Sequence, residues 1–284
     1  MVQRTALVVP FTKMNGAGND FIVLDNRFLR FSEGELATMA RRFCPRRTGI
    51  GADGLLALED AEDADFRMRY RNADGSLGTM CGNGARCLAG FAARAGLGTE
   101  QDDGVRLQFD TDGGRYCARV PDRGRAGEVV LEVPDAGDIS PVEAAGRDGL
   151  LRIWTGTEHV VLFVDDASET DVAALGPAIR QDPAFDPTGT NVDFVEVSAG
   201  DRLVVRTFEK GVEAETLACG TGAVASALAA HHAGRLGPAT GRRSVAVQMP
   251  GGTLTVGFDE AGGAVTLAGP AETVYEGTLE WMGE

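Results

Sequence analysis

The sequence is poor in the residues that several common functions require. Only three histidines occur in 284 residues, and no Cys-x-x-Cys motif is present, so the usual ligand patterns of zinc sites are missing. Lysine and arginine number 27 against 42 aspartates and glutamates, which gives a net charge of −15. Nucleic acids and anionic membrane surfaces attract basic faces. We therefore expect no metal ion, no nucleic acid and no membrane among the partners.

Long apolar segments are also scarce. No run approaches the roughly 20 residues that a membrane-spanning helix needs, and MVQRTALVVPF lacks the basic segment and long apolar core of a secretion signal. The five cysteines, at positions 44, 81, 87, 117 and 219, are an odd number, which favours reduced thiols over a disulfide framework. We therefore expect a cytoplasmic protein.

Glycine and short β-branched runs are abundant instead. Runs such as FIVLD, VRLQF, HVVLFV and RLVVRTF are bounded by Gly, Asp or Pro, as strands usually are. Helical patterns are fewer. A capping box from Ser32 to Glu35 predicts a helix through Ala40, and an amphipathic pattern near 170–180 predicts a second.

One pattern occurs twice. TMCGNGARCLAG places Cys81 ahead of Gly-x-Gly and an alanine-rich stretch, and LACGTGAVASALAA does the same for Cys219. Both stretches are small and apolar around most of a helical circumference, which is typical of helices buried on nearly all sides. Each runs into glycines at 96 and 98 or at 234 and 237, which predict the helix ends.

This repeat predicts an α+β fold of two pseudo-symmetric, β-rich, barrel-like domains, each wrapped around one central helix, with the active site in the cleft between them. The polar stretch at 134–150, which is rich in glycine and proline, is the expected junction. We assign residues 1–134 and 272–284 to the domain that carries Cys81, and 135–271 to the domain that carries Cys219.

The two repeated cysteines have three possible explanations. Cys81 and Cys87 lie six residues apart, roughly 240° around a helix, and cannot converge on one metal ion. The glycine-rich turns lack the pattern of a P-loop or a dinucleotide fingerprint, although a helix start with unpaired N–H groups suits a carboxylate.

The third explanation is acid–base chemistry by thiols. A cysteine at a helix N-terminus has its pKa lowered by the helix dipole, which favours the thiolate. One thiolate would remove a proton from a carbon while the second thiol delivers a proton to the opposite face, which is a racemisation or epimerisation. An ordinary buried cysteine is the simpler alternative, and it is preferred for Cys44, Cys87 and Cys117.

Seven motifs follow one another along the chain: KMNGAGNDF, GIGADG, RNADGS, MCGNGARC, GTEHVV, GTNVDF and FEKGVEAETLACGTGA. Together they resemble the diaminopimelate epimerase family over essentially the whole chain. The resemblance implies an isomerase without a cofactor that interconverts LL- and meso-diaminopimelate, a precursor of lysine and of peptidoglycan. It also implies two pseudo-symmetric domains and a homodimer.

The resemblance assigns roles residue by residue. Cys81 and Cys219 match the base and acid, and His159 and Glu209 match an ionisable pair that helps to set the protonation of the cysteines. The remaining matches are substrate-binding positions. Those that would hold the reacting carboxylate through backbone N–H groups are Gly82, Asn83, Gly220 and Thr221, and the asparagines that would contact the substrate are Asn19, Asn72 and Asn191.

The chain departs from the family pattern where the distal end of the substrate is recognised. Lys210 replaces an arginine that grips the distal carboxylate, and lysine cannot make the same planar two-point contact. Glu158 replaces a proline beside His159. A racemase that acts without pyridoxal phosphate on a different amino acid is therefore an alternative. A catalytically silent binding or regulatory relative is another, but the intact cysteine pair argues against it.

Overall fold

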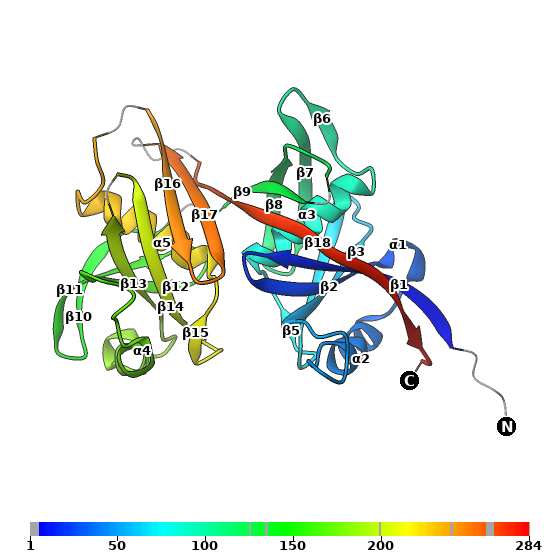
Figure 1. Cartoon of the computed structure of the whole chain (residues 1–284), viewed down its shortest axis with the longest axis horizontal. Coiled ribbons are helices and arrows are strands. Elements are labelled where there is room, and N and C mark those ends of the chain that lie inside the picture. Colours follow the sequence, from blue (N-terminus) through cyan, green and yellow to red (C-terminus); the bar gives the residue numbers. More distant parts are fainter. Residues whose placement is uncertain are drawn as a thin grey trace. The chain divides into compact units, whose positions relative to one another are not determined.

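The chain folds into two compact units (Figure 1). Unit 1 comprises Met1–Leu131 and Pro270–Glu284, and unit 2 comprises Glu132–Gly269. The computed structural model describes residues 6–124, 126–133, 136–198, 200–238, 241–259 and 264–283. The boundary that we expected between residues 134 and 135 lies outside the described residues.

Unit 1 is built mainly from strands. Its helices are α1 (Asn26–Leu29), α2 (Glu33–Phe43) and α3 (Gly82–Arg94). Its strands are β1 (Leu7–Gly16), β2 (Asn19–Asp25), β3 (Gly54–Glu59), β4 (Phe66–Asn72), β5 (Leu77–Gly78), β6 (Thr99–Gln101), β7 (Gly104–Thr111), β8 (Gly114–Val120), β9 (Ala126–Glu132) and most of β18 (Thr266–Trp281).

Unit 2 has a matching inventory. Its helices are α4 (Val172–Arg180), α5 (Gly220–His232) and the 3-10 turn η1 (Pro183–Phe185). Its strands are β10 (Ser140–Ala144), β11 (Arg147–Trp154), β12 (Glu158–Phe163), β13 (Asn191–Ser198), β14 (Arg202–Glu209), β15 (Ala214–Thr216), β16 (Arg242–Met249), β17 (Gly252–Asp259) and the start of β18.

The strand pairings repeat between the units. In unit 1, β1–β2 is antiparallel, β2–β3 parallel, β3–β4 antiparallel, β4–β7 parallel and β7–β8 antiparallel. In unit 2, the pairs β11–β12, β12–β13, β13–β14, β14–β16 and β16–β17 follow the same order of directions. The predicted pseudo-symmetric, β-rich architecture is therefore confirmed.

The parallel pairs explain where the outer helices lie. A parallel pair cannot be joined by a tight turn and needs a crossover, which is usually a helix. Helix α2 lies in the β2–β3 crossover and α4 in the β12–β13 crossover. Ser32 and Glu35 form the expected capping box at the start of α2, and α4 occupies the second stretch that was predicted to be helical.

The two central helices are buried along nearly their whole length. In α3, every residue from Asn83 to Gly90 is buried, and in α5 so is every residue from Gly222 to Ala227. The chain then leaves each helix through a glycine in the left-handed region, Gly96 with φ +85° and Gly234 with φ +64°, as such helix ends favour. Both features were predicted, the burial from the small, apolar stretches and the helix ends from the glycines.

Two segments differ from expectation. Residues 140–154, in part assigned to the junction, form the β10–β11 hairpin, whose turn places Ala145 and Gly146 at φ +52° and +68°. Strand β18 has 16 residues and continues through Pro270, where a proline would normally end a strand. It pairs with β17 through Thr266–Ala268 and with β1 through Glu272–Trp281.

Within the described ranges, no helix is long and apolar enough to cross a membrane.

Candidate active site

The two repeated cysteines occupy the same place in their units. Cys81 is the N-cap residue of α3 and Cys219 is that of α5, both in extended backbone conformation, and each helix has 13 residues. Neither side chain caps its helix. The first N–H groups of a helix have no partner within the helix itself, so both helix starts are places where an anion can be bound.

The Cys81 thiol lies in a polar setting in unit 1. The side chain is half-buried, and Sγ donates to Asn19 Oδ1 at 3.5 Å. The Asn83 amide donates to the same oxygen at 3.4 Å, so the structure brings three of the predicted residues together. Asn19 is itself held by Asp53, whose carboxylate accepts from Asn19 Nδ2 at 2.6 Å.

Arg86 is a member of this setting that sequence reasoning missed. It is 0% exposed, and its guanidinium donates to Asn83 Oδ1 at 2.8 Å and to Gly82 O at 3.4 Å. Burial lowers its pKa, and negative charge on Cys87 and Cys81 acts in the opposite direction. A charged residue inside an otherwise small and apolar helix was the signal that would have found it.

Asn72 is placed differently. Its side chain donates to Ser76 Oγ at 3.0 Å in the turn that follows β4. Its backbone N–H donates to Ser76 O, and Gly75 N–H donates to Asn72 O. In this structure Asn72 thus forms the turn that its RNADGS context also favours, and its contact with substrate remains a prediction.

The Cys219 thiol of unit 2 lies near negatively charged carboxylates, whereas a charged group that interacts with Cys81 in unit 1 is the Arg86 guanidinium. Cys219 is 6% exposed and its sulfur lies 3.4 Å from Thr221 Oγ1. Burial raises the pKa of the thiol well above its usual range, and the carboxylates of Glu209 and Asp193 raise it further. The backbone N–H of Gly222 at the helix start acts to lower the pKa, as expected, but desolvation and the two carboxylates outweigh it, so the net shift is upward.

His159 forms a buried hydrogen-bonded cluster next to Thr221. Its Nδ1 lies 2.7 Å from Asp193 Oδ2, and its Nε2 lies 2.9 Å from Thr221 Oγ1 and 3.2 Å from Asn191 Nδ2. The structure therefore joins the predicted residues His159, Asn191 and Thr221. Asp193, which completes the cluster, was not predicted, although an aspartate inside the apolar strand NVDFVEV was a visible signal.

Glu209 lies close enough to His159 to interact by charge. Burial raises the pKa of Glu209, while the positive charge of a protonated His159 acts to lower it. The hydrogen-bonded carboxylate partner of His159 is Asp193. The next residue, Lys210, donates its backbone N–H to Asn191 Oδ1 at 2.7 Å.

The two residues that depart from the family pattern pair with each other. Lys210 Nζ lies 2.5 Å from Glu158 Oε2, and this hydrogen bond lowers the pKa of Glu158. The lysine side chain is 24% exposed and the glutamate side chain 40%. A positive and a negative group are therefore presented side by side, next to Asn191.

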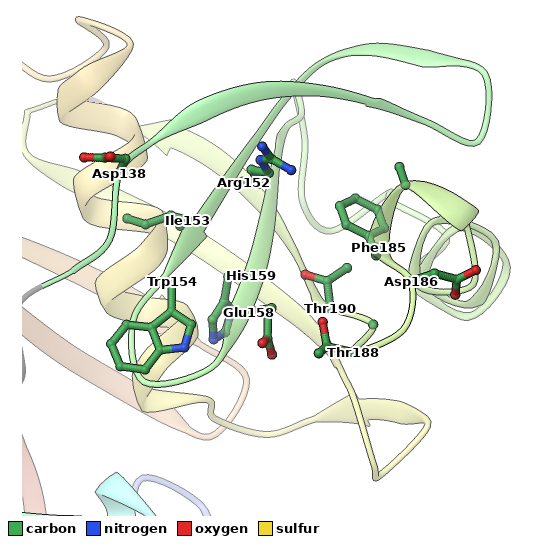
Figure 2. Close-up of a pocket in the computed structure, with 12 residues that line it drawn as sticks. Asp138, Arg152, Ile153, Trp154, Glu158, His159, Phe185, Asp186, Thr188 and Thr190 are labelled. Atoms are coloured by element: carbon green, nitrogen blue, oxygen red, sulfur yellow. The ribbon is translucent and has the colours of Figure 1, made fainter.

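A pocket of about 300 Å³ opens beside these residues in unit 2. Figure 2 shows Trp154 of β11 and Glu158 and His159 of β12 around it, together with residues that follow α4, namely Phe185, Asp186, Thr188 and Thr190. The pocket reaches His159 but its lining does not include Cys219. No group of three or more His, Cys, Asp or Glu side chains suited to a metal ion occurs in the described part of the chain.

Comparisons with known proteins agree on one family. A family model described as diaminopimelate epimerase matches residues 11–135 and 152–274. The diaminopimelate epimerase of Chlorobaculum tepidum is 44% identical over 94% of this chain and 99% of its own length. That of Desulforudis audaxviator is 41% identical over 96% of this chain and 99% of its own length.

Solved structures show the same fold at low identity. A PhzF-family phenazine biosynthesis protein of Bacillus anthracis has a TM-score of 0.71 at 14% identity, over 96% of this chain and 99% of its own. A hydroxyproline epimerase of Agrobacterium vitis has a TM-score of 0.66 at 16% identity, over 99% and 94%. The solved structures show the fold, and the family model and the sequence relatives confirm the resemblance drawn from the seven motifs: the chain belongs to the diaminopimelate epimerase family.

Proposed function

We propose that this protein is an isomerase that interconverts LL- and meso-diaminopimelate by proton transfer at the α-carbon. The observation that carries the proposal is the matched placement of Cys81 and Cys219 as N-cap residues of two buried helices. Two thiols in equivalent positions, each beside an anion-binding helix start, suit a reaction that moves protons on both faces of a carbon next to a carboxylate.

The proposed mechanism uses one thiol from each unit on the same α-carbon. One cysteine, as thiolate, removes the α-proton, and the other, as thiol, delivers a proton to the opposite face. Backbone N–H groups of Gly82, Asn83, Gly220 and Thr221 hold the carboxylate and stabilise the negative charge that develops on it. The raised pKa of Cys219 supports its role as the thiol donor in the resting enzyme.

The distal end of the substrate gives a reason for the two departures from the family pattern. The distal carbon of diaminopimelate carries both an ammonium and a carboxylate. We propose that Lys210 attracts that carboxylate and Glu158 that ammonium, while Asn191, Asn19 and Asn72 supply hydrogen bonds. The named relatives are diaminopimelate epimerases, so the comparisons favour this substrate over another amino acid.

The test is a stereochemical assay of LL-diaminopimelate in deuterated water under reducing conditions. The wild type should form meso product with deuterium at the α-carbon, and Cys81→Ala and Cys219→Ala should each lose at least ~10²-fold in rate. Full epimerisation by Cys81→Ala would contradict the two-thiol mechanism. Parallel assays with lysine, histidine and glutamate would reveal a racemase of different specificity.

We also propose that the enzyme works in the cytoplasm as a homodimer. It needs no cofactor, because two thiols supply both proton transfers. Light scattering on the purified protein would measure its mass against the 29.8 kDa of one chain. Mild oxidation should inactivate the enzyme and dithiothreitol should restore it, since the mechanism brings two thiols to one carbon. Activity that resists oxidants would count against adjacent thiols.

A further inference from the structure

The buried cluster around His159 has a hydrogen-bond pattern that fixes where its protons lie. His159 is 1% exposed, and the side chain of Asp193 is 0% exposed. The Asp193 carboxylate accepts from Thr207 Oγ1 at 2.7 Å through one oxygen and contacts His159 Nδ1 at 2.7 Å through the other. Both oxygens of this buried carboxylate are therefore partnered, as a buried charge requires.

The backbone of Lys210 determines the orientation of the Asn191 amide. The Lys210 N–H donates to one side-chain atom of Asn191, which must therefore be the oxygen. The amide nitrogen is then the atom 3.2 Å from His159 Nε2. Since an amide nitrogen only donates, Nε2 must accept, and in the neutral ring the proton lies on Nδ1, which donates to Asp193.

This orientation also sets the direction of the hydrogen bonds toward Cys219. Because Nε2 is an acceptor, the Thr221 hydroxyl, 2.9 Å away, donates to it. The Thr221 oxygen is then free to accept from the Cys219 thiol, whose sulfur lies 3.4 Å away. A continuous path runs from the Cys219 S–H through the Thr221 O–H to the unprotonated nitrogen of His159.

Unit 1 shows that the fold does not require this polar cluster. The pairing of His159 with Asn191 matches that of Phe21 with Gly54, and the pairing of Asp193 with Thr207 matches that of Leu56 with Tyr70. By this register, Phe21, Leu56 and Tyr70 of unit 1 occupy the positions that His159, Asp193 and Thr207 occupy in unit 2.

The central helices confirm the match. A Cβ on Gly84 would lie 3.2 Å from Leu56 Cδ2, and one on Gly222 would lie 2.5 Å from Asp193 Oδ1. In unit 1 the position is filled by packed apolar groups, and Phe21 meets Tyr70 edge to face. A buried ionisable pair adds little stability over such packing, so stability alone does not account for Asp193.

We propose that Asp193 is the positioning residue for the proton chemistry of Cys219: it holds His159 with Nε2 unprotonated, and Thr221 relays protons between that nitrogen and the thiol. As Cys219 gives its proton to Thr221 Oγ1, Thr221 gives its hydroxyl proton to His159 Nε2. The products are a thiolate and an imidazolium paired with the Asp193 carboxylate. The reverse transfers move the same proton from the imidazolium back to the thiolate and restore the resting thiol. This inference rests on the proposed function only in assigning chemistry to Cys219.

The first test is a spectroscopic one that needs no substrate. In ¹⁵N-labelled full-length protein at neutral pH, with His159→Gln used for assignment, His159 should show a pyrrole-type Nδ1 and a pyridine-type Nε2. The reversed pattern would overturn the proposal. This measurement holds even if diaminopimelate proves not to be the substrate.

The second test is kinetic. Asp193→Asn keeps the shape but removes the charge, and it should lower kcat for α-hydrogen exchange by about 10-fold or more with little change in KM. The matched control is Glu196→Gln, on the same strand, whose carboxylate accepts from Ala167 N–H far from His159 in the hydrogen-bond network. It should keep wild-type kcat. Unchanged kcat in a folded Asp193→Asn would refute the proposal while leaving the two-thiol function intact.

The relay has its own test. Thr221→Val removes the hydroxyl but keeps the backbone N–H of the helix start, and Thr221→Ser keeps both. The valine variant should lose about 10-fold or more in kcat, and the serine variant should recover most of that loss. Equal activities of the two variants would exclude the hydroxyl relay. If the wild type exchanges no α-hydrogen at all, the proposed function fails, and the ¹⁵N pattern still decides the position of the His159 proton.

Discussion

Units 1 and 2 share a strand order and a central helix, yet they give their cysteines opposite electrostatic surroundings. In unit 1, Cys81 lies beside the helix that carries the buried cation of Arg86, and the matched interior positions are apolar. In unit 2, Cys219 lies near the carboxylates of Asp193 and Glu209. A duplicated scaffold thus places two thiols symmetrically and then makes them chemically unequal, as a pair of one base and one acid must be.

The largest expected effect comes from introducing into the interior of unit 1 a buried carboxylate like the one in unit 2. Leu56→Asp puts a carboxylate at a fully buried position of unit 1, where Phe21 and Tyr70 stand in place of the histidine and threonine that partner Asp193. It should cost about 3 kcal/mol or more in the free energy of unfolding, because the charge is buried and unpaired. Urea titration would measure it.

The control for that exchange is Leu56→Met, a swap of similar volume that should cost less than about 1.5 kcal/mol. A tolerated Leu56→Asp, with a loss close to that of the methionine variant, would show that unit 1 can host the polar cluster and would weaken the contrast between the units.

A smaller effect is expected at the paired glycines. Gly222→Ala places a methyl group 2.5 Å from Asp193 Oδ1 and must displace the carboxylate. We expect about a 10-fold or greater fall in kcat through misplaced proton-transfer groups. Gly84→Ala meets only side-chain ends at 3.2 and 3.4 Å, and it should change stability by about 1 kcal/mol or less, since alanine favours the helix.

Steady-state kinetics and thermal unfolding of both variants would check this prediction. Equal losses of activity would mean that the helix start itself, and not the Asp193 cluster, is sensitive to the added methyl group.

The smallest effect concerns the pH dependence of stability. Burial raises the folded-state pKa of Glu209 above its unfolded value, so its contribution is present at low pH and is lost as pH rises through the folded pKa. In unit 1, burial acts to raise the pKa of Asp20, but hydrogen bonds from Arg46 and Lys13 outweigh it and hold the pKa at about 2. Its contribution is present above the unfolded pKa and is lost as pH falls toward 2.

Urea unfolding of Glu209→Gln and Asp20→Asn between pH 2 and pH 8 separates the two cases. Relative to wild type, Glu209→Gln should gain stability as pH rises, and Asp20→Asn should lose it. Parallel curves for the two variants would contradict the opposite signs.

The sequence predicts much of this molecule because its strongest patterns are local. Gly-x-Gly after each cysteine and the alanine-rich runs specify two buried helices, and the Ser32–Glu35 capping box specifies the start of α2. Strand β18 was only partly predicted, because Pro270 is a local signal against a strand and its pairing with β1 depends on residues at the other end of the chain.

The unpredicted parts of the candidate site have the same origin. Asp193 gains its role from the register of three strands, which brings His159 and Thr207 against it from distant segments. Burial and the carboxylates of Glu209 and Asp193 raise the pKa of Cys219, whereas the helix start, which the sequence does reveal, acts to lower it. Local patterns located the thiols, but the charge around each thiol is a tertiary property.

Strand β18 has a consequence for how the molecule is made. Unit 2 is a continuous segment, so all of its residues have been synthesised before the last strand is complete. Unit 1 contains the first residues of the chain, but β1 lacks its β18 neighbour until Glu272–Trp281 has been translated. Domains usually fold in the order in which they leave the ribosome. Here unit 1, whose synthesis begins before that of unit 2, completes its β1–β18 pairing only after unit 2 has been synthesised.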